Sequence, residues 1–100
     1  MSERQLSDAV AELARHLGWL AYHTHDSRHS AAGFPDWVLC HPVHQRLIFV
    51  ELKSAKGKTT AAQEEWLAAL DALAFLDEPP EVYVWRPEDW TSGRIEALLR

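Results

Sequence analysis

Three charged residues, Asp36, Glu51 and Lys53, lie in two neighbouring segments that otherwise have the composition of buried β-strands. Side chains alternate along a strand, so Glu51 and Lys53 are expected to point to one face of a sheet and Leu52 to the other. A hairpin whose turn is centred just after Val43 would pair Asp36 directly with Glu51. The two carboxylates would then face each other with Cβ atoms about 4.5–5.5 Å apart.

Two carboxylates held this close repel each other and destabilise a sheet unless another group compensates. One compensation is a shared proton, which raises the pKa of one acid. Another is a bound divalent cation, because Mg²⁺ and Mn²⁺ prefer oxygen ligands. Lys53, on the same face as Glu51, could then steady an attacking water or the negative charge that develops on a phosphate. The alternative is that Asp36 and Glu51 are strand-end charges, each paired with a Lys or an Arg.

A third acid, Glu3, is predicted to approach this pair from an N-terminal helix. Ser2 and Gln5 have the spacing of a capping box, and apolar residues follow at helical intervals up to Gly18. Glu3 shares the apolar stripe that contains Leu6, so it lies at the end of the face that packs on the sheet. It is therefore the candidate for a helix-borne metal ligand or water anchor.

The remaining pattern predicts the elements that must position these residues, in the order α-β-β-β-α-β-α. The predicted strands cover residues 19–24, 34–41, 46–53 and 81–86, and a helix that opens at Thr60 precedes the last strand. The second and third strands form an antiparallel hairpin. The third strand, the helix and the fourth strand form a βαβ unit, whose strands are parallel and joined by a right-handed crossover. The predicted fold class is therefore α/β, with a small mixed β-sheet flanked by helices.

Length and composition limit the function further. The chain of 100 residues predicts one domain over residues 1–100, and 47% hydrophobic with 25% charged residues is typical of a globular protein. A formal net charge of −5 excludes a cationic, nonspecific nucleic-acid coat. The single cysteine, Cys40, excludes a disulfide scaffold and a Cys-rich zinc site. We expect no membrane span and no signal peptide, and a cytoplasmic location.

Three basic residues, Arg28, Lys56 and Lys58, lie on predicted loops. As phosphate contacts they would hold a nucleic-acid backbone, and their contribution would weaken as salt rises. The alternative is that Lys56 and Lys58 only keep a loop soluble. Arg28 precedes the hairpin that carries the acids, which favours a DNA contact.

Three further residues have expectations that a structure can check. Trp37 alternates with Asp36 and should face away from the acids, and an exposed aromatic there would indicate a dimer surface. His41 is expected in a solvated turn. Cys40 is expected to be a small buried apolar residue.

The same residues carry a family resemblance. The Gly-Phe-Pro-Asp sequence at 33–36, followed by Glu-Leu-Lys at 51–53, resembles the signature of the PD-(D/E)XK nucleases. More narrowly, the chain resembles the VRR-NUC family, which includes small stand-alone phage and bacterial proteins. The resemblance runs from the helix that carries Glu3, through Gln63, to residues 84–87, and so covers nearly the whole chain.

This resemblance implies a restriction-endonuclease-like fold and a divalent-metal-dependent DNA endonuclease, which is a phosphodiester hydrolase. It assigns the binding of Mg²⁺ or Mn²⁺ to Glu3, Asp36, Glu51 and the Leu52 carbonyl. Lys53 would position or activate the hydrolytic water. Gln63 matches the helix glutamine that lies beside the catalytic site in the family.

Substrate and partners stay open at this point. The DNA could be structured or branched, such as a junction or a flap, or it could be an ordinary duplex. A small domain that cuts both strands symmetrically needs a homodimer. The alternatives are a non-catalytic DNA- or protein-binding module, or a nuclease subunit active only within a larger phage or replication and repair assembly. The set of Asp36, Glu51 and Lys53 favours the nuclease, because a binding module has no need of opposed acids.

Overall fold

The computed structural model describes residues 1–24 and 31–100, so Arg28 lies outside the described residues. The elements follow in this order along the chain: α1 (Glu3–His16), β1 (Leu20–His23), β2 (Trp37–His41), β3 (Arg46–Leu52), α2 (Ala61–Asp71), the 3₁₀-helix η1 (Ala72–Phe75), β4 (Glu81–Trp85), α3 (Pro87–Thr91) and α4 (Arg94–Leu99). None of the described helices is long and apolar enough to cross a membrane.

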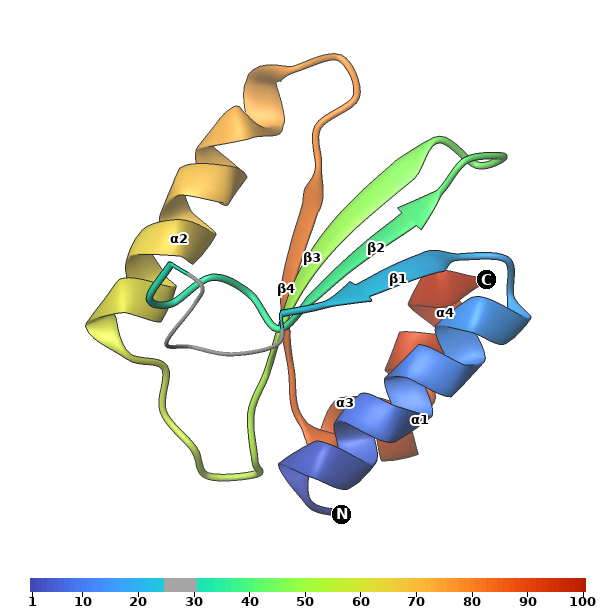
Figure 1. Ribbon diagram of the computed structural model, residues 1–100, viewed down its shortest axis with the longest axis vertical. Coiled ribbons are helices and arrows are strands. Elements are labelled where there is room, and N and C mark those ends of the chain that lie inside the picture. The colour runs from blue at the N-terminus through green and yellow to red at the C-terminus, as the bar shows by residue number, and fades with distance from the viewer. Residues whose placement is uncertain (25–30) are drawn as a thin grey trace.

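In the described part of the chain, the strands form one mixed sheet in the order β1-β2-β3-β4 (Figure 1). Strand β2 runs antiparallel to both β1 and β3, whereas β3 and β4 are parallel. The predicted antiparallel hairpin and the predicted βαβ pair are both confirmed. With helices on both faces of this mixed sheet, the arrangement is restriction-endonuclease-like.

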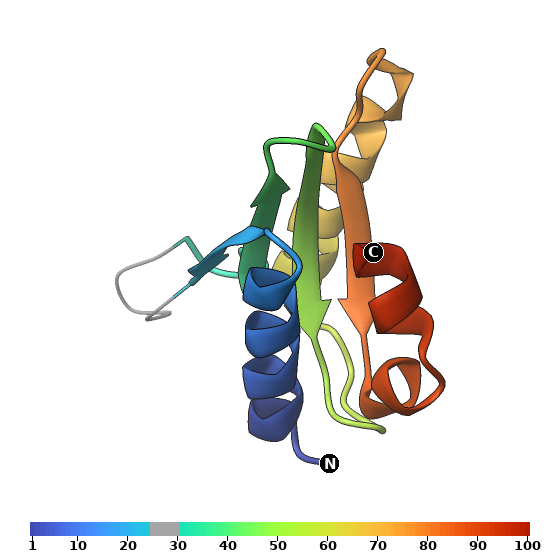
Figure 2. The same cartoon turned by 90° about the vertical axis from the view of Figure 1, so that its right-hand side faces the viewer.

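Helix α1 covers one face of the sheet together with the short helices α3 and α4, and α2 lies against the opposite face (Figures 1 and 2). The predicted capping box at the start of α1 is present, because Ser2 Oγ accepts from the Gln5 N–H and Gln5 Oε1 accepts from the Ser2 N–H. The most buried hydrophobic residues, each at most 2% exposed, form one cluster: Leu6, Val10, Ala14, Trp19, Leu39, Ile48, Val50, Leu52, Trp85, Ile95 and Leu99.

The α2 side is packed less densely. No residue of α2 is fully buried, although this helix lies entirely within the described chain. Its main aromatic contact runs through Phe34, whose ring lies edge-on to Trp66 at a centroid distance of 5.0 Å and to Phe49 of β3 at 6.1 Å. This cluster fastens the first half of α2 to the sheet.

The second strand begins later than the sequence predicted. β2 starts at Trp37 rather than at residue 34. Pro35 has no N–H to donate to a ladder, and Gly33 has a φ of +82°, which interrupts extended backbone just before the strand. The pairing with β1 still reaches one residue further, because the Thr24 N–H donates to the Asp36 carbonyl at 2.8 Å.

The predicted burial of Cys40 and the predicted exposure of His41 were both wrong, and Trp37 does not show the exposure that would indicate a dimer surface. Cys40 is exposed, because its side chain lies on the sheet face that α2 leaves open. His41 is 6% exposed rather than solvated, since its Nε2 lies 3.1 Å from the Leu17 carbonyl oxygen and its Nδ1 accepts from the His44 N–H. Trp37 is only 5% exposed, so the condition set for a dimer surface at that residue is not met.

Candidate active site

Asp36 and Glu51 lie opposite each other at one end of the β2–β3 hairpin. Trp37 pairs with Val50 in the ladder, so the next residues outward, Asp36 and Glu51, are opposed as predicted. The Asp36 side chain is fixed by the chain itself, because its Oδ2 accepts from the Leu52 N–H at 2.7 Å. The hairpin therefore brings the two carboxyl groups together.

The Glu51 carboxyl group is buried, with 2% of the residue exposed. Its Oε1 accepts from Gln63 Nε2 at 2.8 Å, whereas its Oε2 has no hydrogen-bond partner in the described chain. Burial raises the pKa of Glu51 to about 8, and the charge of the nearby Asp36 carboxylate adds to the rise. The nearby Lys53 ammonium opposes the rise and the Glu3 carboxylate adds to it. Such a group needs either a proton or a cation.

Gln63 is aimed at Glu51 by the way α2 begins. The predicted capping box is present, since Thr60 Oγ1 accepts from the Gln63 N–H at 3.2 Å and Gln63 Oε1 accepts from the Thr60 N–H at 2.8 Å. Because the amide oxygen is occupied by that backbone donor, the amide NH₂ is left to donate to Glu51. One glutamine thus both caps the helix and holds the buried acid.

Gly33 allows this helix start to approach the hairpin. A Cβ on Gly33 would lie 2.3 Å from the Ala62 carbonyl carbon and 2.6 Å from the Gln63 backbone nitrogen, closer than real Cβ contacts. Only glycine fits at that distance, and its φ of +82° also favours glycine. Sequence reasoning used Gly33 only as part of a motif and missed this contact. The sequence itself offered no sign of which backbone approaches it.

Glu3 lines a cavity of about 490 Å³ that it shares with Asp36, one member of the acid pair. Glu3, His23, Asp36 and Leu52 line it, together with Arg4, Ser7 and Asp8. The His23 ring lies against Trp37 at a centroid distance of 4.6 Å, so it is held in place as a strand histidine. Within the described residues, no group of three or more His, Cys, Asp or Glu is close enough to hold a metal ion. The chain therefore brings two of the three predicted acids together and places Glu3 at the rim.

Lys56 and Lys58, two of the predicted basic residues, lie at the same end of the sheet as the acid pair. The Lys53 N–H donates to the Trp85 carbonyl at 3.0 Å, which holds the chain beside β4 just after β3 ends. Lys56 and Lys58 are exposed on the loop that joins Lys53 to α2. The prediction for Arg28 falls outside the described residues.

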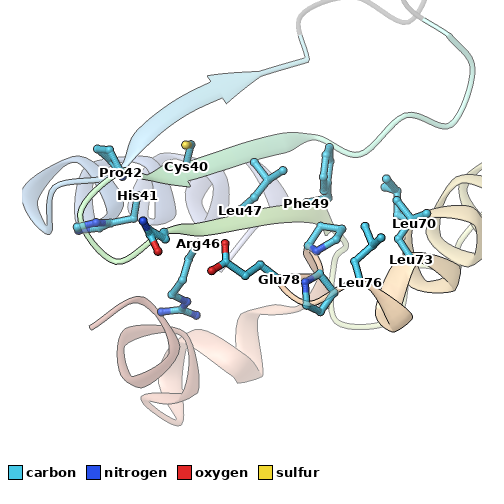
Figure 3. A pocket seen from close by; sticks show the side chains of 13 residues that line it. Cys40, His41, Pro42, Arg46, Leu47, Phe49, Leu70, Leu73, Leu76 and Glu78 are labelled. Atoms are coloured by element: carbon cyan, nitrogen blue, oxygen red, sulfur yellow. The ribbon is translucent and has the colours of Figure 1, made fainter.

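A larger cavity, of about 570 Å³, lies at the other end of the hairpin (Figure 3). Leu47 and Phe49 line it from the sheet, and Leu70, Leu73 and Leu76 line it from α2 and the residues that follow. It contains none of the predicted site residues and holds no pair of acids. A cavity without groups that could bind a metal or act as an acid or base is a poor candidate for an active site, however large it is. We therefore place the candidate site at the opposed carboxylates.

A restriction-endonuclease-like fold with an opposed Asp and Glu, followed by Lys two residues later, defines the PD-(D/E)XK class of nuclease domain. Within that class, the family model of the VRR-NUC domain matches residues 1–76, about three quarters of the chain. The chain therefore belongs to the VRR-NUC domain family, and this membership indicates a nuclease-type function in DNA processing. No curated protein and no solved structure matches the chain.

Proposed function

We propose that this protein is a divalent-metal-dependent DNA endonuclease that hydrolyses phosphodiester bonds. The observation that carries the proposal is the buried Glu51 Oε2, which has no hydrogen-bond partner in the described chain and lies on the residue opposite Asp36. Two opposed carboxylates suit Mg²⁺ or Mn²⁺, which are bound through few carboxylates and often keep several water ligands. Asp36 and Glu51 would hold the ion, with the Leu52 carbonyl and Glu3 as the further predicted ligands. The ion, when bound, supplies polarisation of the scissile phosphate and a lowered pKa for a bound water.

The protein's own residues would then orient the reactants. Lys53 follows Glu51 by two residues, so its ammonium can hold the attacking water or the charge that develops on the phosphate. Gln63 keeps the Glu51 carboxylate in one orientation through the 2.8 Å hydrogen bond. Arg28, Lys56 and Lys58 would hold the DNA backbone without reading its sequence.

The proposed substrate is DNA that is structured or branched, such as a junction or a flap, or an ordinary duplex. Symmetric cutting of two strands would require a homodimer. The net charge of −5 gives little general attraction for DNA, which favours assistance from phage or replication and repair proteins. Light scattering at several protein concentrations would measure the oligomeric state.

The first test is cleavage of labelled duplex, single-stranded, flap and four-way-junction DNA in Mg²⁺, Mn²⁺ or EDTA. We expect metal-dependent cutting that falls at least about 1,000-fold in Glu51→Gln and Asp36→Asn, comparable to the loss of one strong transition-state contact. The matched control is Glu65→Gln, an exposed acid on α2, which should cut at the wild-type rate. Lys53→Met should slow cutting but keep the thermal stabilisation by metal.

Two outcomes would overturn the proposal. Cutting that persists in EDTA or in Glu51→Gln would indicate a contaminating nuclease. No cutting of any DNA in either metal, together with no change in melting temperature on adding metal, would favour the non-catalytic binding module. Metal stabilisation without cutting would instead favour a subunit that awaits its assembly.

A further inference from the structure

Arg86 lies just after β4, beyond the residues that the family model matches. In the parallel β3–β4 register, Leu52 pairs with Trp85, so the next residues are Lys53 and Arg86. The Lys53 N–H donates to the Trp85 carbonyl, which keeps the segments that follow β3 and β4 adjacent past the end of the ladder. Arg86 is therefore placed beside the proposed catalytic lysine by a segment that lies beyond the residues the family model matches.

The Arg86 guanidinium closes the loop that follows Lys53. Its Nη1 donates to the Ser54 carbonyl at 2.8 Å and to the Gly57 carbonyl at 2.6 Å. The loop is already turned on itself, because the Gly57 N–H donates to the Ser54 carbonyl at 3.3 Å. Arg86 is itself fixed by α3, since its N–H donates to Asp89 Oδ2 at 2.8 Å. Two loop carbonyls are thus tied to one anchored cation.

The loop that Arg86 closes carries the exposed cations of this end of the sheet. Lys56 and Lys58 flank Gly57, whose carbonyl accepts from Arg86. Gly57 also lies along the Lys53 side chain, because a Cβ built on it would come 3.8 Å from Lys53 Cδ. The shape of this loop therefore sets where the three ammonium groups can reach.

We propose that Arg86 is a positioning residue for DNA binding, and that it acts by holding the loop of residues 54–58 in its binding conformation. The inference rests on the proposed DNA endonuclease function. It extends the DNA-binding machinery to the C-terminal segment beyond residue 76. A lysine is a poor replacement for this arginine, because both carbonyls accept from the planar Nη1 group, whose direction the guanidinium fixes, whereas an ammonium is a flexible point charge.

The test is the affinity for a labelled duplex and a four-way junction in EDTA, where cutting is prevented, over a range of salt concentrations. We expect Arg86→Gln and Arg86→Lys to weaken binding by about tenfold, because both lose the charge-assisted bonds to the loop. The matched control, Arg100→Gln, removes an exposed arginine that pairs only with Glu96 in the described chain, and it should bind as the wild type does. Wild-type binding in Arg86→Lys would overturn the proposal in favour of a simple charge effect.

A double-variant comparison separates loop positioning from direct contact. In a Lys56→Gln, Lys58→Gln background, Arg86→Gln should cost much less affinity than it does in the wild type, because its effect passes through those lysines. Full additivity would overturn the proposal. Trypsin should also cut after Lys56 and Lys58 faster in Arg86→Gln and Arg86→Lys than in Arg100→Gln, which reports on the loop without DNA. A rate of trypsin cleavage after Lys56 and Lys58 that stays unchanged in both Arg86 variants would also overturn the proposal.

Failure of this inference is distinguishable from failure of the proposed function. If the wild-type chain neither binds nor cuts DNA, both proposals fall. If the wild type binds and cuts DNA while the Arg86 variants match Arg100→Gln in affinity and in loop proteolysis, only the role of Arg86 falls.

Discussion

The two faces of the sheet are packed very differently. On the face that α1 and α4 cover, the inward residues Leu39, Ile48 and Val50 are all fully buried. On the face that α2 covers, Leu47 is 38% exposed and Cys40 is exposed as well. One face is therefore a close-packed core, whereas the other leaves a cavity between β3 and α2 (Figure 3).

This difference assigns separate tasks to the two layers. The α1 and α4 layer buries most of the apolar surface, and burial of that surface is the main source of folding free energy. Helix α2 is fastened to the sheet near its N-terminus, where Phe34 contacts Trp66, Gly33 meets the backbone of residues 62–63, and Gln63 binds Glu51. The site thus lies where the weakly packed layer is attached most firmly.

The largest expected effect tests the difference in stability directly. Leu39→Ala empties a fully buried position on the α1 face and should lower the free energy of unfolding by about 2–5 kcal/mol. Leu73→Ala removes the same atoms from a residue that is 37% exposed beside α2, and should cost less than about 1 kcal/mol. Urea denaturation of both variants measures the contrast. Equal losses would show that the α2 face is packed as firmly as the core.

The sequence was sufficient where a local pattern determines the geometry. Alternation along the strands, together with an assumed turn centre just after Val43, predicted that Asp36 opposes Glu51, and the β2–β3 register confirms this. The spacing of Thr60 and Gln63 likewise predicted the capping box that the structure contains. In each case the partners are close in the chain or are related by one hairpin.

What the sequence could not predict depends on contacts between distant segments. The approach of Gly33 to α2 and the bond from Arg86 to the Ser54 carbonyl join residues that no local pattern relates. The burial errors have the same origin. Cys40 was expected inside and His41 outside, but burial at these positions depends on how far α2 extends over the sheet and where the end of α1 lies.

The next effect concerns the buried acid at the junction of the two layers. Burial raises the pKa of Glu51 from its ordinary value near 4.5 to about 8, so the folded chain binds this proton more tightly than the unfolded chain does. The stability that this proton contributes is complete below about pH 4.5 and is lost as the pH rises through about 8. Metal-free protein should therefore lose about 1–3 kcal/mol of unfolding free energy between about pH 5.5 and 7.5 through this group.

Glu51→Gln isolates this contribution from the titration of the histidines, because it keeps the shape and cannot ionise. In EDTA, the unfolding free energy of Glu51→Gln should therefore rise relative to that of the wild type by about 1–3 kcal/mol between about pH 5.5 and 7.5. Glu65→Gln, on the exposed side of α2, should follow the wild type. A difference that does not change with pH would mean that Glu51 is ionised throughout and is compensated by the protein alone.

The last effect, similar in size to that of Glu51, tests how α2 is attached. Gly33→Ala and Gly93→Ala introduce the same methyl group at nearly the same backbone angle, since φ is +82° at Gly33 and +83° at Gly93. Among the described residues, no heavy atom lies within 4 Å of a Cβ at Gly93, whereas at Gly33 the Ala62 carbonyl carbon is 2.3 Å away. The left-handed strain is shared, so the difference between the two variants measures the contact with α2.

We expect Gly33→Ala to be less stable than Gly93→Ala by about 1–3 kcal/mol, the usual cost of overpacking. Urea denaturation measures this difference, and DNA cleavage in Mg²⁺ shows where the strain is relieved. If α2 moves away from the hairpin, Gln63 loses its hold on Glu51, and cleavage should fall well below that of Gly93→Ala even where both variants are fully folded. If the two variants cut equally well, the start of α2 can shift without disturbing the acid pair, and the weakly packed layer does not position the site.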